Sequence, residues 1–113
     1  MREFEKAFKL PFKVKHKGSC CVDANDQFCF ETFDYLSKES KDILQSSIDN
    51  KDVKRQDVYY DDKEQYIYVD EKPFISIRGW GYLTGIGGLN LSDDEAVKIQ
   101  DDLANYLVEQ LQG

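Results

Sequence analysis

The densest group of residues that could do chemistry lies between residues 78 and 88, where five glycines and the only tryptophan of the chain stand together. A glycine-rich turn that leads directly into a helix can hold a phosphate on the free backbone N–H groups of that helix. Here the predicted helix begins several residues later, and its first turn carries the carboxylates of residues 93–95, which would repel a phosphate. The segment also has no Walker lysine, so it does not have the pattern of a nucleotide-binding loop.

Three other roles for this segment stay open. Glycines permit positive φ angles and close packing, so it can be a structured loop whose larger side chains pack beneath a sheet, namely Trp80, Tyr82, Leu83 and Ile86. Alternatively, Arg78, Trp80 and Tyr82 form a partner-binding site, because these residue types dominate the energetics of protein interfaces. The third alternative is a small-ligand-binding domain that uses the glycine-rich loop.

A second group consists of four tyrosines on two predicted strands: Tyr59, Tyr60, Tyr66 and Tyr68. Aromatic side chains on a sheet can stack on nucleic-acid bases, but base-binding sheets also carry basic residues. These tyrosines stand among Asp and Glu residues instead, so base stacking is not expected. Cross-strand aromatic packing is the structural interpretation, and a protein-binding face that includes Tyr66 and Tyr68 is the functional one.

The sequence contains no recognisable catalytic or metal-binding constellation. His16 is the only histidine and lies beside lysines on a predicted edge strand, which argues against a nucleophile activated by histidine. The spacing of Cys20, Cys21 and Cys29 matches no zinc motif, and three cysteines with an adjacent pair are a poor disulfide framework, so we expect free thiols. We therefore predict no catalytic residue, no metal and no cofactor, which favours a non-enzymatic protein without excluding an enzyme.

Charge is distributed unevenly along the chain. Residues 1–17 hold six Lys or Arg against two Glu, a net charge of +4, and the other residues hold nine Lys or Arg against twenty Asp or Glu, a net charge of −11. An acidic surface repels phosphate backbones, so nucleic acid is not expected as a partner. Such a surface can also imitate nucleic acid, and an acidic inhibitor of a host nuclease or defence complex is therefore an alternative function.

Hydrophobic periodicity predicts the elements that position these residues. Residues 8–17 alternate between apolar and polar, as in a half-buried strand that Gly18 ends or bulges. Pro11 and the outward lysines place this strand at a sheet edge. Residues 19–22 and 27–31 form a hairpin around the polar turn between them.

The rest of the chain predicts a helix, three strands and a second helix. Apolar residues at helical spacing mark the first helix, from Asp34 to about Asp49. Three strands form a meander at Val58–Asp61, Tyr66–Asp70 and Phe74–Arg78, and its core face consists of Ile67, Val69, Ile75 and Ile77. The last helix follows a capping box at Ser92 and Glu95, and its apolar face consists of Ala96, Ile99, Leu103, Leu107 and Leu111.

The segment RGWGYLTGIGGLNLSDDEAVKIQDDLANYL, from Arg78 to Leu107, resembles part of a group of short proteins from bacteriophages and mobile elements of gut bacteria. The match covers about a quarter of the chain. The resemblance implies a setting, the cytoplasm of an infected or lysogenic bacterium. It implies no activity, cofactor or site residue.

Together these patterns predict a single α+β domain over residues 1–113. It contains an antiparallel sheet of about five strands with two helices, in the order β-β-α-β-β-β-α. No apolar run is long enough to cross a bilayer, so a cytoplasmic protein is expected. The predicted function is a small non-enzymatic accessory or interaction protein of phage or mobile-element origin, whose partner is another protein or, as an alternative, a second copy held by the apolar helix face.

Overall fold

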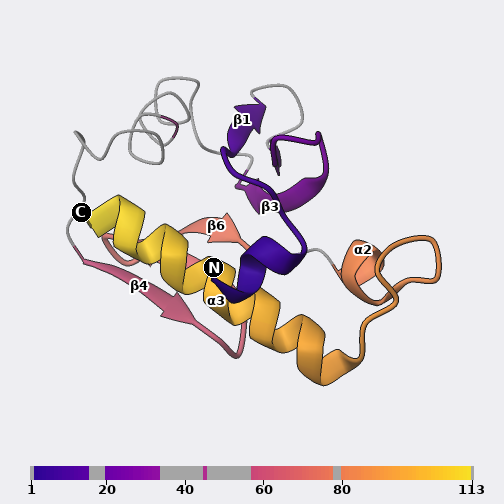
Figure 1. Ribbon diagram of the computed structural model, residues 1–113. Helices are drawn as coiled ribbons and strands as arrows, with labels where there is room; N and C mark the ends of the chain where they lie inside the picture. The colour runs from indigo at the N-terminus through magenta and orange to yellow at the C-terminus, as the bar shows by residue number, and fades with distance from the viewer. Residues whose placement is uncertain (1, 16–19, 34–44, 46–56, 78–79, 113) are drawn as a thin grey trace.

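The computed structural model describes residues 2–15, 20–33, 45, 57–77 and 80–112. Its helices and strands are, in chain order, η1 (Glu3–Lys6), β1 (Lys13–Lys15), β2 (Cys20–Val22), β3 (Phe28–Thr32), β4 (Val58–Asp61), β5 (Tyr66–Val69), β6 (Lys72–Ser76), α2 (Trp80–Thr84) and α3 (Asp93–Gln112). They form an α+β fold in which the long helix α3 lies across the sheet (Figure 1).

The described strands form one antiparallel sheet in the order β1-β2-β3-β6-β5-β4. It is built from two three-stranded meanders, which are joined where β3 pairs with β6. The two edge strands are therefore β1 and β4. Within the described residues, no helix is long and apolar enough to cross a membrane.

The predicted α+β class is confirmed, but the predicted element order is wrong. The described elements run β-β-β-β-β-β-α-α, with six strands. β1 and β2 are separate antiparallel neighbours, so of the two predicted alternatives the first strand ends before Cys20 and does not continue as a bulged strand. A short helix, α2, also forms in the glycine-rich segment where a loop was predicted. Of the helix predicted from Asp34 to about Asp49, only Gln45 belongs to the described residues, and it is helical.

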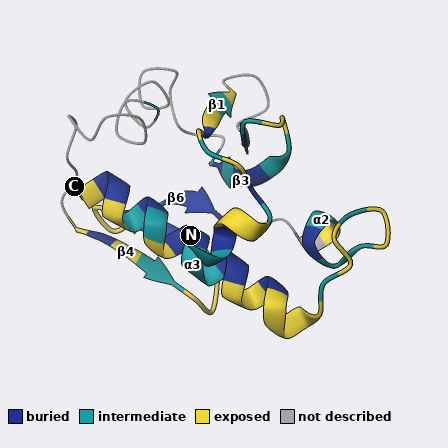
Figure 2. Cartoon of the chain, in the orientation of Figure 1, coloured by how far each residue is buried: buried dark blue, intermediate teal, exposed yellow. Residues whose placement is uncertain are grey.

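The predicted core is confirmed on both the helix and the sheet (Figure 2). The apolar face of α3 is buried over its whole length, and so is the predicted core face of the meander; the two sets are Ala96, Ile99, Leu103, Leu107 and Leu111, and Ile67, Val69, Ile75 and Ile77. At the start of α3, the Ser92 hydroxyl accepts a hydrogen bond from the Glu95 N–H at 3.3 Å, as predicted. The Ser92 hydroxyl in turn donates to the Glu95 carboxylate at 3.1 Å.

An aromatic N-terminal segment closes the core over α3. Phe4, Phe8 and Phe12 are buried. Of the strand predicted over residues 8–17, the structure describes residues 8–15, and among these Lys13–Lys15 form a strand. The Phe4 N–H donates to Asp102 Oδ2 at 3.0 Å, and Arg2 donates to Asp102 Oδ1 at 3.2 Å. The helix therefore anchors the N-terminal segment through the Asp102 carboxylate and also through Glu109, to which Arg2 donates at 2.6 Å. β1 lies at the sheet edge as predicted.

The buried carboxylate of Asp23 organises the turn between β2 and β3. Its side chain is 1% exposed. It accepts hydrogen bonds from the backbone N–H groups of Lys9 at 2.8 Å, Asn25 at 2.9 Å and Gln27 at 2.9 Å. Asp23 thus holds the turn and the N-terminal segment together.

The glycine-rich segment turns from α2 toward α3 through a close backbone approach. Leu83 is buried, as the loop interpretation predicted, but Ile86 is 94% exposed, so its predicted packing beneath the sheet is wrong. A Cβ atom on Gly88 would lie 2.0 Å from the Tyr82 carbonyl oxygen, whereas a Cβ atom on Gly87 would meet nothing within 4 Å. Position 88 therefore requires glycine for lack of space, whereas position 87 does not.

We predict that Gly88→Ala lowers the free energy of unfolding by about 1–3 kcal/mol, because backbone rather than a flexible side chain must move away from the new methyl group. Gly87→Ala is the matched control and should change stability by less than about 0.5 kcal/mol. Urea unfolding followed by circular dichroism measures both. Equal stabilities of the two variants would contradict the close approach.

We also predict that Asp23→Ala destabilises the protein by about 2–4 kcal/mol, because it leaves buried backbone N–H groups without an acceptor. Asp26→Asn, three residues away, removes the same charge at an exposed position with a φ of 61° that Asn tolerates. Asp26→Asn should lower the free energy of unfolding by less than about 0.5 kcal/mol. Thermal and urea unfolding distinguish the two, and a small effect of Asp23→Ala would disprove the role of this carboxylate.

Candidate functional site

The structure describes three of the five side chains predicted to contact a partner. Arg78 lies outside the described residues, and Trp80 is described only as the first residue of α2. The Tyr82 side chain is half-buried: its ring lies 5.8 Å from that of Phe8, and its hydroxyl donates to the Ala7 carbonyl at 3.4 Å. Tyr82 therefore helps to join α2 to the N-terminal segment. Tyr66 and Tyr68 lie on β5.

Tyr66 and Tyr68 belong to a continuous row of aromatic rings on one face of the sheet, which we call the tyrosine face: Phe33, Tyr66, Tyr68 and Tyr59. Tyr59 and Tyr68 are direct cross-strand partners, and their rings stack with centroids 5.1 Å apart and only 3° between the planes. Tyr59 is 49% exposed. The row thus ends in a flat, preformed and solvent-accessible aromatic pair.

The tyrosine face has carboxylates at its border. The Tyr68 hydroxyl donates to Glu64 Oε2 at 2.9 Å. This bond raises the pKa of Tyr68 to about 12, with smaller effects of desolvation and of nearby charges. The hairpin from Asp57 to Lys72 contains six acidic and two basic residues, so the field around the aromatic pair is negative.

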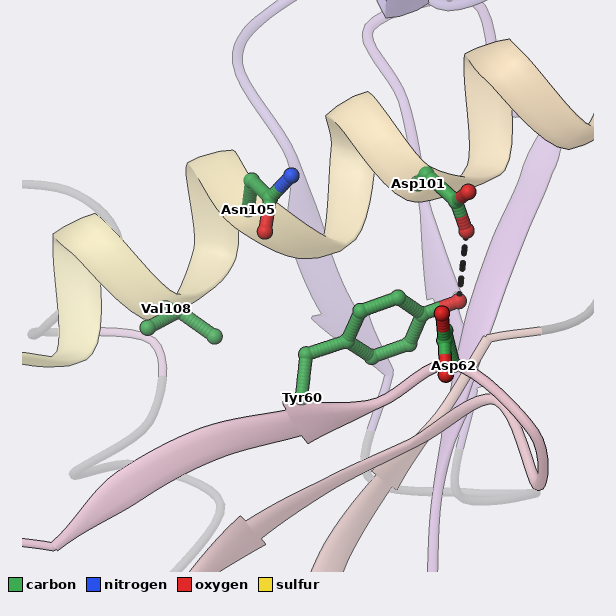
Figure 3. A pocket seen from close by; sticks show the side chains of 5 residues that line it. All are labelled: Tyr60, Asp62, Asp101, Asn105 and Val108. Carbon is green, nitrogen blue, oxygen red and sulfur yellow. Dashed lines mark hydrogen bonds between the residues drawn. The ribbon is translucent and has the colours of Figure 1, made fainter.

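Tyr60 points to the opposite side of β4, toward α3, because successive strand residues face opposite sides. There it lines an open pocket of about 370 Å³ together with Asp62, Asp101, Asn105 and Val108 (Figure 3). The Tyr60 hydroxyl donates to Asp101 Oδ1 at 3.0 Å. Burial, this hydrogen bond and the charges of nearby Asp residues raise the pKa of Tyr60 above its ordinary value.

The sequence analysis did not predict this pocket, although the spacing of three residues on α3 indicates that they lie on one face of the helix. Asp101, Asn105 and Val108 are spaced four and three residues apart, so they share one face of α3 next to the apolar stripe. Of these residues, Asp101 holds the contact with the strand, because its carboxylate accepts the hydrogen bond from Tyr60. The spacing of these residues could not show that β4 lies opposite this face of α3.

The pocket is suited to a cationic group rather than to catalysis. Its wall offers two carboxylates, an amide and an aromatic ring, which accept hydrogen bonds and attract positive charge. No group of three or more His, Cys, Asp or Glu side chains in the described chain is arranged to hold a metal ion. The buried thiols of Cys21 and Cys29 are poor nucleophiles, because burial raises their pKa values.

Comparison with known proteins gives no assignment: no protein-family model matches the chain, and no curated protein or solved structure is significantly similar to it. The function is therefore argued from the geometry of these two surfaces.

We predict that Tyr60→Phe lowers the free energy of unfolding at neutral pH by about 0.5–1 kcal/mol, because it removes a half-exposed hydrogen bond. A raised pKa in the folded state favours the neutral phenol. The stabilisation is therefore complete below the unfolded-state pKa of about 10 and is lost as the pH rises through the folded-state pKa. The difference between wild type and variant should shrink above about pH 10.

Tyr59→Phe is the matched control, because the exposed Tyr59 hydroxyl has no described hydrogen-bond partner. Urea unfolding at neutral and high pH measures both variants. If Tyr59→Phe and Tyr60→Phe showed the same pH dependence, the bond to Asp101 would not stabilise the fold.

Proposed function

We propose that the protein is a small non-enzymatic interaction protein that binds a basic segment of a partner protein on its tyrosine face. The observation that supports this proposal is the stacked pair of Tyr59, exposed on the edge strand β4, and Tyr68, half-buried on β5 and hydrogen-bonded to the Glu64 carboxylate. Guanidinium and ammonium groups are attracted to the face of an aromatic ring, and each such contact contributes about 0.5–2 kcal/mol.

Rigidity adds to the argument for a binding surface. Both rings are held by the cross-strand register, and Tyr68 is further held by its bond to Glu64. A preformed surface loses little conformational entropy when a partner binds. Tyr is also one of the residue types in which binding energy concentrates.

The acidic border supports a basic ligand rather than a nucleic acid. Carboxylates next to the rings repel phosphate groups and attract Lys and Arg side chains. The setting that the sequence resemblance implies, a phage or mobile element in a bacterial cell, is compatible with a bacterial protein as the partner.

A second candidate is an acidic inhibitor of a nuclease or defence complex, and the observation behind it is the density of carboxylates on the β4–β5 hairpin. An imitation of nucleic acid depends on charge, whereas the first proposal depends on the tyrosine rings as well. Strong sensitivity to ionic strength with no sensitivity to Tyr59 would therefore favour the inhibitor.

We predict that selection from a display library of random short peptides enriches Arg and Lys. For the best binder, Tyr59→Ala should raise Kd about tenfold, because a cation–π contact is lost, whereas Tyr59→Phe should change it less than about twofold. Ile86→Ala, which truncates the 94% exposed side chain of the α2–α3 loop, is the control for loss of an exposed apolar group. Calorimetry measures each affinity.

Two outcomes would overturn the proposal. One is a selection without basic enrichment. The other is a basic peptide whose affinity falls equally in Tyr59→Ala and Ile86→Ala.

A further inference from the structure

The two edges of the sheet differ in how their backbone groups are satisfied. At β1, the Gln45 side chain acts like a residue of a neighbouring strand: its Nε2 donates to the Phe12 carbonyl at 3.0 Å and its Oε1 accepts from the Val14 N–H at 2.5 Å. The exposed lysines Lys13 and Lys15 flank this contact. The β1 edge is therefore closed to a further strand.

At β4, two hydrogen bonds fix which backbone groups face outward. The Asp70 N–H donates to the Asp57 carbonyl at 3.3 Å, just beyond the β4–β5 ladder. The Ile77 N–H donates to the Gln65 carbonyl at 2.8 Å, just beyond the β5–β6 ladder. Because bonded and non-bonded pairs alternate in antiparallel ladders, both bonds direct the backbone groups of Ile67 toward β6 and away from β4.

The N–H and C=O groups of Val58 and Tyr60 consequently point away from β5, at the free edge of the sheet. Gln112 of α3 donates to the Val58 carbonyl at 2.8 Å, which agrees with this direction. Within the described part of the chain, no side chain bonds to the backbone of Tyr60 as Gln45 does to β1. As far as the described residues extend, the β4 edge is thus open at Tyr60.

The open edge lies between the two surfaces described above. A strand added to β4 would direct alternate side chains to opposite sides of the sheet. The residue beside Tyr60 would face the pocket, where Asp62 and Asp101 supply carboxylates, and its neighbour would lie beside the exposed Tyr59 ring.

We infer that β4 is a docking edge for an extended basic segment of a partner protein, which adds as a further strand, pairs with the Tyr60 backbone and places a Lys or Arg in the β4–α3 pocket. The inference rests on the proposed function, because both take a basic protein segment as ligand. Strand addition of this kind obtains affinity from main-chain hydrogen bonds and specificity from pockets for alternate side chains.

Charge disfavours a second copy of this chain as the occupant. Pairing of two β4 edges would bring together hairpins that each hold six acidic and two basic residues between Asp57 and Lys72. Like charges directly opposite each other destabilise a strand pair. A lysine or arginine segment meets the same carboxylates favourably.

The test uses a blocked peptide of alternating lysine and threonine and records amide hydrogen exchange of the intact protein by NMR. Without peptide, the Tyr60 amide should exchange fast and the Tyr59 amide slowly. The peptide should slow exchange at Tyr60 by at least about tenfold. N-methylation of every second peptide residue should raise Kd more than about tenfold when the methyl groups replace the N–H groups that face β4. Shifting the methylated positions by one residue should change Kd little, because those N–H groups point away from β4.

Two aspartate variants test the pocket. Asp101→Asn keeps an acceptor for the Tyr60 hydroxyl but removes the charge, and it should raise Kd about tenfold. Asp94→Asn removes a charge from the exposed first turn of the same helix and should change Kd less than about twofold.

The outcomes separate this inference from the proposed function. Binding that depends on Tyr59 but leaves Tyr60 exchange unchanged and tolerates N-methylation in both registers would overturn strand addition alone. Absence of binding by any basic peptide would overturn both. Protection of Tyr60 without peptide, increasing with protein concentration, would identify a second copy as the occupant and overturn the inference.

Discussion

Leu103, Leu107 and Leu111 are fully buried in the core that α3 shares with the sheet and the N-terminal segment, and the positions of the other elements depend on this contact. Burial of a leucine side chain contributes about 1.5–3 kcal/mol. Three such residues therefore approach the whole net stability of a typical domain, about 5–15 kcal/mol. Because η1 and β4 both contact α3, the azimuth of this helix determines the N-terminal anchor and the pocket together (Figure 1).

Residues that are neighbours in sequence consequently make different contacts. On α3, Asp102 holds the backbone of Phe4, while Asp101 faces β4 and accepts the bond from Tyr60. On β4, Tyr60 faces the helix, while Tyr59 belongs to the tyrosine face. A shift of β4 by one residue would exchange the two tyrosines and remove both surfaces. The register that stabilises the core therefore also sets the geometry of the candidate site.

The elements with a strong local pattern could be predicted from sequence. The period of α3 identified its buried face, and β4 has the predicted bounds. The period-two pattern predicted β1 correctly at residues 13–15 but is wrong at residues 8–12, where Phe8 and Phe12 are buried in an irregular segment that Asp23 holds through the Lys9 N–H. The pocket and the stacked pair depend on which strand lies opposite which helix and in what register. Periodicity within one element does not contain that information.

The difference between the two sheet edges is difficult to explain by stability alone. An open edge strand with aromatic residues invites aggregation, and folded proteins usually block such edges. This chain blocks β1 with lysines and the Gln45 amide, and in its described residues the Gln112 side chain caps β4 at the Val58 carbonyl but no side chain caps Tyr60. Around Tyr60 it relies on carboxylates, which repel another copy of the same strand but attract a basic one. If β4 is the docking edge that we infer, its charge favours a basic partner strand over a second copy, whereas the Gln45 contact at β1 occupies backbone groups that any added strand would need.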